Sequence, residues 1–249
     1  MKDVVRVAAM ADMHVPRGGR ADLQPAFAAA AAVADVLVLA GDLTDYGLPE
    51  EAKLVVAALV PTVKIPVVAV LGNHDFESGK QDEVKKILVD AGVIVLDGDA
   101  QEVAGVGFAG VKGFAGGFGP RALGPWGEAA IKVFVHEAVN EALKLEGALA
   151  RLRTPHRVAV LHYAPIIGTC SGEPPEIYPF LGSSRLEDPL NRYPVSAVFH
   201  GHAHRGSLEG RTREGVPVYN VAMALLAQAF PGQPPIRVIE LPAAMAAVA

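Results

Sequence analysis

Short runs of apolar, often β-branched residues alternate with longer stretches of helical periodicity along this chain. Such alternation is typical of βαβ units, in which helices cover buried parallel strands. The main expected strands are residues 4–11, 36–40, 67–71, 157–161 and 197–199, and the longest expected helix is 128–153. Because no internal repeat or low-complexity linker divides the 249 residues, we predict a single α/β domain over residues 1–249.

Polar side chains follow five of these strands at the point where each strand ends. The clusters are Asp12-Met13-His14, Gly41-Asp42, Gly72-Asn73-His74-Asp75, His162 and Gly201-His202-Ala203-His204. Because ligands bind outside the carboxyl ends of the strands in open α/β sheets, we expect these side chains to converge there. Five of the eight histidines fall in these clusters, which are rich in the side chains that bind metal ions. The pattern therefore predicts a metal site.

Charge and cysteine content narrow the classes of function. The sequence has 22 lysines and arginines against 27 aspartates and glutamates, a formal net charge of -5. An acidic chain is a poor partner for the phosphates of DNA or RNA, so we do not expect nucleic-acid binding. The single cysteine, Cys170, cannot form a disulfide within the chain, which favours a reducing compartment, the cytoplasm.

The apolar segments are too short to anchor the chain in a membrane. The most apolar stretch, residues 26–41, is interrupted by Asp35 and falls short of the ~20 residues that a spanning helix needs. The N-terminal apolar run contains Arg6 and ends at Asp12, which is unlike a signal peptide. We therefore expect no membrane partner.

At the five clusters the sequence resembles the calcineurin-like metallophosphoesterase superfamily. The pattern of that superfamily is D-x-H, G-D, G-N-H-D/E, a lone H and G-H-x-H, and every element is present in order between Asp12 and His204. Five ordered elements are far more specific than one short motif. The resemblance implies an α/β fold, a four-layer β-sandwich of two mixed sheets flanked by helices, with a dinuclear metal centre at the strand ends.

The resemblance also implies which side chains would bind each ion. One ion would be held by Asp12, His14, Asp42 and His204, and the other by Asp42, Asn73, His162 and His202, with Asp42 bridging both. Imidazole and carboxylate ligands suit Mn, Fe, Zn or Ni, whereas Ca or Mg sites are richer in oxygen. We expect two divalent transition-metal ions, whose identity the ligands leave open.

The implied chemistry is hydrolysis of a phosphate ester by a hydroxide that bridges the two ions. His74, next to the ligand Asn73, would be the general acid that protonates the leaving oxygen. Asp75 would orient the His74 ring and support its charged form. The alternative role for His74 is outer support of Asn73.

Departures from particular subfamilies narrow the substrate class. Protein serine/threonine phosphatases have an arginine in the segment G-D-x-x-D-R-G and a glutamate in G-N-H-E, where this chain has Tyr46 and Asp75. The five-element pattern is similar to that of bacterial cyclic nucleotide and glycerol phosphodiesterases. It implies a small phosphodiester or phosphomonoester substrate, with the diester preferred, and leaves the oligomeric state open.

A different class of function is a non-catalytic scaffold or binding protein. The superfamily includes a sorting-complex subunit that binds partners through this fold and lacks the catalytic histidine. This chain retains His74 and every ligand residue, which favours the enzyme. Metal-dependent hydrolysis of a chromogenic phosphodiester would distinguish the two.

Two loops are candidates for covering the site. The segment between Tyr163 and Tyr193 is too long for an ordinary connection, and loops of this size are usually functional or mobile. Its aromatic residues and Arg185 could line a pocket for the leaving group, or the segment could be a locally packed loop. The glycine-rich run 113–119 is either a mobile flap or a flexible surface loop.

Overall fold

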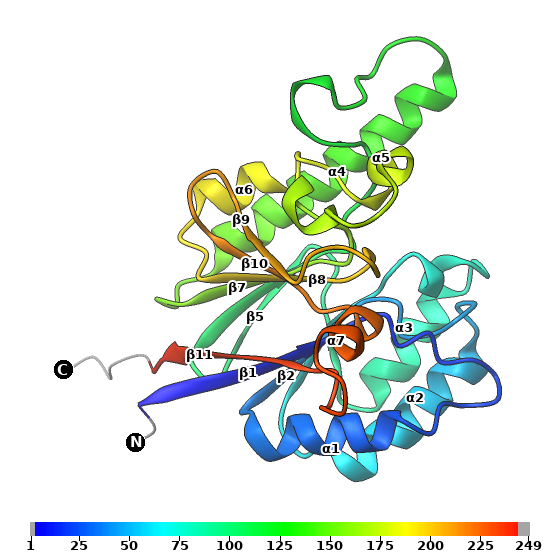
Figure 1. Ribbon diagram of the computed structural model, residues 1–249, viewed down its shortest axis with the longest axis vertical. Helices are drawn as coiled ribbons and strands as arrows, with labels where there is room; N and C mark the ends of the chain where they lie inside the picture. The colour runs from blue at the N-terminus through cyan, green and yellow to red at the C-terminus, as the bar shows by residue number, and fades with distance from the viewer. Residues whose placement is uncertain (1–2, 244–249) are drawn as a thin grey trace.

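The computed structural model describes residues 3–243, whose strands form two separate sheets (Figure 1). The first sheet has five strands in the order β11-β1-β2-β3-β4. Their bounds are Arg237–Pro242 for β11, Val4–Met10 for β1, Val36–Ala40 for β2, Val67–Val70 for β3 and Ile94–Val95 for β4. β1 to β4 run parallel, whereas β11 pairs antiparallel with β1. The first sheet is therefore mixed.

The second sheet has six strands in the order β5-β6-β7-β8-β10-β9. Their bounds are Asp99–Val103, Val106–Gly110, Arg157–Val160, Ala197–His200, Pro217–Asn220 and Glu209–Arg211 in that order. The four central strands are parallel, and β5 and β9 pair antiparallel at the two edges. Two mixed sheets confirm the predicted fold class.

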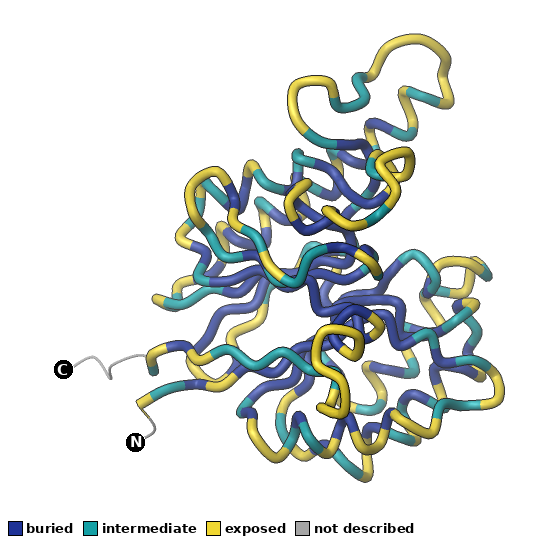
Figure 2. The backbone as a smooth tube through the Cα atoms, in the orientation of Figure 1, coloured by how far each residue is buried: buried dark blue, intermediate teal, exposed yellow. Residues whose placement is uncertain are grey.

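Helices cover the outer faces of both sheets, which gives four layers (Figure 1). The helices of the first half are α1 (Leu23–Val33), α2 (Pro49–Thr62) and α3 (Gln81–Asp90), and those of the second half are α4 (Ala129–Arg151), α5 (Tyr178–Leu181), α6 (Glu187–Arg192) and α7 (Met223–Ala229). Figure 2 shows the buried backbone concentrated along the strands and the inner faces of the helices.

Strand β2 shows why the central strands are continuous apolar runs in the amino-acid sequence. All five of its residues are buried. Leu37 and Leu39 belong to the core under α1, α2 and α3, while Val36 and Val38 belong to the core between the sheets. Since successive side chains of a strand point to opposite faces, a strand between two cores must be apolar at every position.

Two segments differ from the sequence-based expectation. The sequence predicts a hairpin-rich end with strands at 207–208, 217–221 and 236–241, but α7 lies between β10 and β11 and buries Met223, Leu225 and Leu226. Seven residues make only about two helical turns, too few for a helical period to stand out. The segment after Tyr163 holds short helical pieces, including α5, α6 and the 3₁₀ turns Ile167–Cys170 and Pro175–Ile177.

Within residues 3–243, no helix combines the length and the apolar character that crossing a membrane requires.

Candidate metal centre

The predicted ligands meet because five parallel strands end at one edge of the two sheets. β1 leads into Asp12, β2 into Asp42, β3 into Asn73, β7 into His162 and β8 into His202. The chain turns sharply at these ends. Among the described residues, non-glycine residues with positive φ include Asp12 (59°), His14 (42°), Asp42 (49°) and His202 (70°). Such strained backbone is concentrated at functional sites in proteins.

One group of ligand atoms is formed by Asp12, His14 and His204. His204 Nε2 lies 3.0 Å from Asp12 Oδ1 and 3.4 Å from His14 Nε2. Asp12 is buried and also accepts hydrogen bonds from the backbone N–H of His202 at 3.0 Å. The three side chains predicted for the first ion besides Asp42 therefore face one another.

A second group is formed by Asp42, His162 and His202. His162 Nε2 lies 3.3 Å from Asp42 Oδ2 and 2.8 Å from Asn73 Oδ1, and the rings of His162 and His202 are 5.0 Å apart between centroids. The side chains predicted for the second ion are thus also brought together.

Asp42 lies between the two groups. Its Oδ2 is 3.3 Å from His162 Nε2 and 3.7 Å from His14 Nε2. Gly72 and Gly41 allow this approach, because a Cβ on Gly72 would clash with Asp42 Oδ1 and one on Gly41 would lie 2.5 Å from His162 Nδ1. The Asp42 carboxylate therefore lies close to a histidine of each group.

The partners of His162 fit a cation at its Nε2 atom. Its Nδ1 lies 3.0 Å from the carbonyl oxygen of Ala40, which can only accept, so the Nδ1–H donates to it. Its Nε2 then faces two further oxygens, those of Asn73 and Asp42. In a neutral ring of this tautomer, the Nε2 lone pair would point at both oxygens and be repelled by them. A proton on Nε2, or a metal ion between Nε2 and the oxygens, would remove this repulsion.

Burial and neighbouring charges set the protonation of these groups. Burial disfavours the charged form of Asp42, but His162 outweighs it and holds the pKa of Asp42 well below its usual range. Burial likewise opposes charge on His162, but Asp42 raises the pKa of His162 to about 9. Burial lowers the pKa of His202 to about 4, so its ring is neutral at pH 7 and has a lone pair available for a metal.

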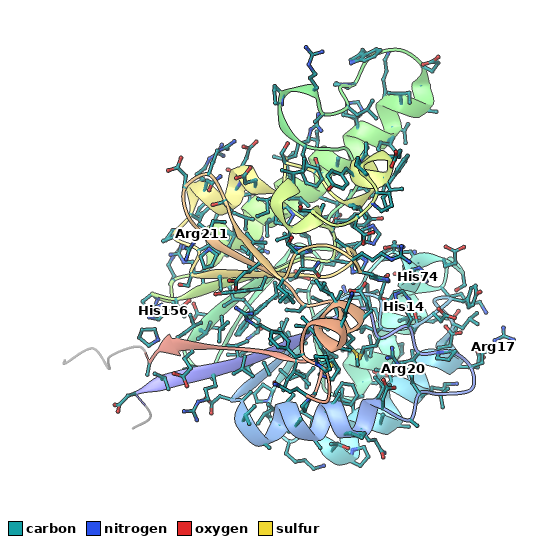
Figure 3. The ribbon with its side chains drawn as sticks, viewed as in Figure 1. His14, Arg17, Arg20, His74, His156 and Arg211 are labelled. Atoms are coloured by element: carbon teal, nitrogen blue, oxygen red, sulfur yellow. The ribbon has the colours of Figure 1, made fainter. Side chains whose placement is uncertain are left out.

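His74 lies beside the first group and contacts Asp45, a residue that the sequence pattern did not single out. His74 Nδ1 is 2.7 Å from the carbonyl oxygen of Asp45, and the His74 ring meets the His14 ring edge to face at 4.4 Å between centroids. Figure 3 shows the labelled His14 and His74 close together. Asp45 Oδ1 is 3.9 Å from His14 Nδ1. The only signal in the sequence is that Asp45 follows Asp42 by three residues in the same loop.

The predicted role of Asp75 in orienting His74 is wrong. Its carboxylate accepts hydrogen bonds from Gly72 N at 2.8 Å, Thr44 N at 2.9 Å and Thr44 Oγ1 at 2.6 Å. His74–Phe76 is a 3₁₀ turn, and in it the Asp75 side chain points inward and is fully buried. The carbonyl of Asp45 takes the place next to the His74 ring.

The segment after Tyr163 packs against the second group. The Tyr163 and His202 rings are 4.5 Å apart between centroids, and His202 Nε2 lies 3.1 Å from the carbonyl oxygen of Phe180. Arg185 Nη2 instead donates to the carbonyl of Leu123 at 2.9 Å. The glycine-rich run is tied to this segment, since Gly117 N donates to Gly182 O at 2.9 Å. The two loops thus form one packed unit.

Comparison with known proteins adds a family and a set of similar folds. The sequence profile described as Calcineurin-like phosphoesterase matches residues 5–206. No curated protein matches the sequence. The fold is similar to a phosphopantetheinyl hydrolase from Mycobacterium tuberculosis, with a TM-score of 0.68 and 17% identity over 96% of this chain and 97% of that one.

Two further structures share the fold at lower similarity. A protein from Thermus thermophilus has a TM-score of 0.56 and 13% identity over 96% of this chain and 99% of that one. A putative 5'-nucleotidase from Staphylococcus aureus has a TM-score of 0.54 and 15% identity over 87% of this chain and 48% of its own. At these sequence identities, the similarity to the solved structures shows a shared fold only.

Proposed function

The chain belongs to the calcineurin-like phosphoesterase family, and we propose that it hydrolyses a small phosphate ester at a dinuclear metal centre. The observation that carries the proposal is the position of Asp42, whose Oδ2 lies within 3.7 Å of His14 and 3.3 Å of His162. One carboxylate between two groups of nitrogen and oxygen ligands is what two adjacent cations need.

The seven predicted ligands would hold two divalent ions, drawn from Mn, Fe, Zn and Ni. The first ion would be bound by Asp12, His14, Asp42 and His204, and the second by Asp42, Asn73, His162 and His202. When bound, such a pair supplies an activated water and positive charge that faces the phosphoryl oxygens.

His74 would protonate the leaving oxygen. Its Nδ1–H donates to the carbonyl of Asp45, which fixes the ring and leaves Nε2 for the proton that is transferred. The ring lies against His14, a ligand of the first ion, so the proton would be delivered beside the phosphoryl group. Asp75 would act one step further out, by fixing the loop that carries His74.

We propose a small phosphodiester as the preferred substrate, with a phosphomonoester as the second choice. The motif pattern is similar to that of bacterial cyclic nucleotide and glycerol phosphodiesterases. The solved structures of similar fold include a phosphopantetheinyl hydrolase and a putative 5'-nucleotidase, and both names refer to phosphate esters. We further propose that residues 1–249 form one domain that works in the cytoplasm.

The test is metal-dependent hydrolysis by the purified chain. Protein stripped with a chelator and reconstituted with Mn, Fe, Zn or Ni should hydrolyse bis(p-nitrophenyl) phosphate faster than p-nitrophenyl phosphate. The matched inactive control is Asp42→Asn, which keeps the size of the side chain and removes the bridging charge. Equal hydrolysis by both proteins would contradict the site, and inactivity of the wild type with every metal and ester would favour the scaffold.

A further inference from the structure

A buried asparagine outside the predicted ligand set contacts the loop that carries two of the proposed ligands. Asn220 is the last residue of β10 and is only 1% exposed. Its Nδ2 donates a hydrogen bond at 2.7 Å to the carbonyl oxygen of Ala203, which lies between His202 and His204 in the chain. The Asn220 side chain therefore holds the backbone between proposed ligands of two different ions.

Both ends of the Asn220 amide have partners that fix its orientation. The carbonyl of Ala203 can only accept a hydrogen bond. The backbone N–H of Ala222, 3.2 Å from Asn220 Oδ1, can only donate one. An aspartate at this position would lose the bond to Ala203, and a leucine would lose both bonds.

The Asn220 side chain also connects the two sheets beside the first ligand group. The chain that follows Asn220 is bonded to the end of β1, because Met223 N donates to the carbonyl oxygen of Ala11 at 3.0 Å. Ala11 directly precedes Asp12. Asn220 thus links the loop after β8, which carries His204, to the segment that holds Asp12 in place.

The loop after β8 needs support because its backbone is strained. His202 has a φ of 70°, a left-handed conformation that costs free energy for a residue with a side chain. The Ala203 carbonyl accepts a second hydrogen bond, from Gly206 N at 3.1 Å, but Gly206 belongs to the same loop. Of the two bonds to this carbonyl, only the one from Asn220 comes from outside the loop.

The His204 ring depends on its backbone more than the His202 ring does. His202 has an outer partner, since its Nε2 lies 3.1 Å from the carbonyl oxygen of Phe180. Among the described residues, the polar contacts of the His204 ring are with Asp12 at 3.0 Å and His14 at 3.4 Å, both proposed ligands of the same ion. The position of the His204 ring is therefore set by the loop that carries it.

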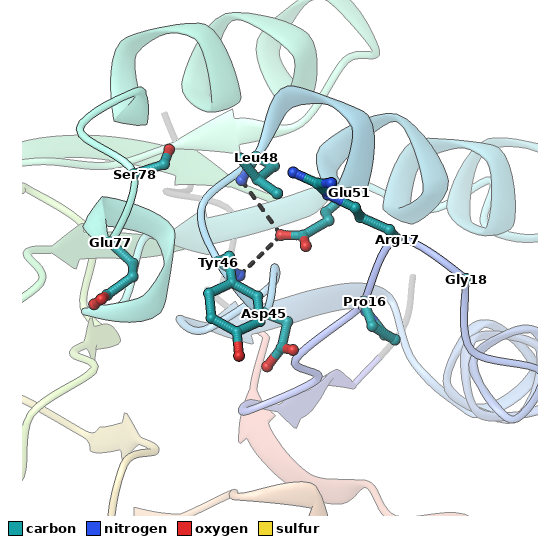
Figure 4. A pocket seen from close by; sticks show the side chains of 9 residues that line it. All are labelled: Pro16, Arg17, Gly18, Asp45, Tyr46, Leu48, Glu51, Glu77 and Ser78. Carbon is teal, nitrogen blue, oxygen red and sulfur yellow. Dashed lines mark hydrogen bonds between the residues drawn. The ribbon is translucent and has the colours of Figure 1, made fainter.

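The first ligand group is also open on its outer side. The side chains of His14 and His204 are 20% and 41% exposed, whereas that of His162 in the second group is fully buried. The chain after His14 borders a cavity of about 660 Å³, which Pro16 and Arg17 help to line (Figure 4). Because these rings are not enclosed by packed side chains, their backbone must be fixed from within the protein.

We propose that Asn220 is a positioning residue of the metal centre, which places His204 opposite Asp12 through its bond to the Ala203 carbonyl. The inference rests on the proposed dinuclear centre and assigns to Asn220 no contact with an ion or with the substrate. Its effect should be larger on the first ion than on the second, because His202 has an outer partner of its own.

The first experiment measures Mn binding to chelator-treated protein by calorimetric titration. Asn220→Leu keeps the approximate size of the side chain and removes both of its hydrogen bonds. We expect the affinity for one of the two Mn ions to fall by about 10- to 100-fold, the usual loss when a residue that supports a ligand is replaced. The affinity for the other ion should change little. Equal weakening of both ions, or of neither, would overturn the proposal.

Two further variants separate the Ala203 bond from a general loss of stability. Asn220→Asp keeps an acceptor for Ala222 N–H but turns an oxygen toward the Ala203 carbonyl, so it should weaken the same ion. The matched control is Val218→Ala, which removes a buried apolar group from the same strand and leaves the Ala203 bond intact. If Val218→Ala weakens that ion as much as Asn220→Leu does, destabilisation of β10 explains the loss and the proposal is wrong.

A double-mutant cycle identifies the ligand through which Asn220 acts. In His204→Ala the first ion is already weakened, so adding Asn220→Leu should cause little further loss of Mn affinity. In His162→Ala, which removes a ligand of the second ion, adding Asn220→Leu should still weaken the first ion by its full factor. Losses that simply add in the His204→Ala background would contradict an action through His204.

Electron paramagnetic resonance gives a spectroscopic reading of the same effect. Two neighbouring Mn ions give a magnetically coupled spectrum, whereas a single bound ion gives the spectrum of isolated Mn. At equal and limiting Mn content, Asn220→Leu should show a smaller coupled signal than the wild type, and Val218→Ala should match the wild type. An unchanged coupled signal in Asn220→Leu would count against the positioning role.

Hydrogen exchange of the metal-free protein tests the loop without any ion. The backbone N–H groups of His204 and Gly206 should exchange about tenfold faster in Asn220→Leu than in the wild type, and at the wild-type rate in Val218→Ala. If the wild type binds fewer than two Mn ions but these amides respond, the dinuclear centre fails and the support of the loop by Asn220 stands. If the wild type binds two ions and Asn220→Leu binds them equally well, the centre stands and the role of Asn220 fails alone.

Discussion

Thr44 donates its hydroxyl hydrogen to Oδ1 of Asp75 over 2.6 Å, and this bond joins the loop after β2 to the loop after β3. Backbone N–H groups of Leu43, Thr44 and Gly72 donate to the same carboxylate. Burial, followed by the charge of Asp42, raises the pKa of Asp75 to about 6, against the effect of these bonds. Asp75 thus fixes the loop after β2 and the loop after β3 relative to each other.

Asp75→Asn should destabilise the fold. In the variant, the amide NH₂ group would face backbone N–H groups that now donate to the carboxylate, so two donors would oppose each other. We therefore expect the free energy of unfolding to fall by roughly 2–4 kcal/mol. Thr44→Val removes one donor and should cost about 1 kcal/mol. Urea denaturation of the metal-free proteins measures both. An Asn variant as stable as the wild type would show that the carboxylate anchors nothing.

The sequence predicted which side chains converge better than the contacts that support them. The proposed ligands follow buried strands, and the apolar runs of these strands can be recognised in the sequence. Because parallel strands end at one edge of a sheet, Asp12, Asp42 and His162 could be placed together. The contact of His74 with the Asp45 carbonyl is a backbone contact across loops, which leaves no trace in residue type.

The arrangement of the sheets could not be derived from periodicity either. An apolar run such as β2 shows that both faces are covered, but not whether a helix or a second sheet covers each one. The two-sheet fold came from the resemblance in the motifs. The short helix α7 was missed because its seven residues are apolar nearly throughout.

His74→Ala should lower the turnover number without changing metal binding. We expect near-normal metal content and turnover lower by about 10²- to 10⁴-fold, the usual contribution of a positioned proton donor. A nitrophenolate leaving group needs less protonation than an alkoxide, so the loss should be smaller on a nitrophenyl ester than on an alkyl ester. Equal losses on both esters would assign His74 to positioning of Asn73 instead.

Metal content should follow the two ligand groups. Reconstitution with Mn should approach two ions per chain, measured by elemental analysis of desalted protein. Asp42→Asn should weaken both positions, because its Oδ2 lies near both groups, whereas His14→Ala should mainly empty one. A wild-type stoichiometry that saturates at one, or the same loss in both variants, would contradict the shared carboxylate.

The metal-free protein should lose stability as the pH rises above neutral. Burial works against a charged His162, but Asp42 outweighs it and raises the pKa from 6.5 to about 9. A histidine whose pKa is higher in the folded state contributes stability that is fully present below pH 6.5 and is lost as the pH rises through about 9. Each unit of difference corresponds to about 1.4 kcal/mol.

We therefore expect the Tm of chelator-treated protein to fall between pH 6.5 and about 9. His162→Gln should have a lower Tm at pH 6.5 and a flatter profile across this range, since the titrating ring is gone. Scanning calorimetry over the pH series measures the effect. A profile as steep in the variant as in the wild type would assign the dependence to other groups.

An apolar cavity on the His202 side should select the alcohol that the phosphate retains. This cavity of about 700 Å³ lies between the glycine-rich run, the start of α4 and α5, and Phe180 lines it with 60% of its surface exposed. The Phe180 carbonyl lies 3.1 Å from His202 Nε2, so the cavity borders the second ligand group. An apolar group on the substrate would bury its surface against the Phe180 ring.

Phe180→Ala should therefore lower kcat/KM for octyl nitrophenyl phosphate relative to methyl nitrophenyl phosphate by about tenfold, a change of about 1.4 kcal/mol. Metal content should be unaffected, because the contact with His202 is made by the backbone. Ile177→Ala is the matched control, since Ile177 is another exposed apolar residue of this segment but does not line the cavity. If the octyl-to-methyl ratio stays at the wild-type value in Phe180→Ala, or falls equally in both variants, the cavity does not receive the apolar group of the substrate.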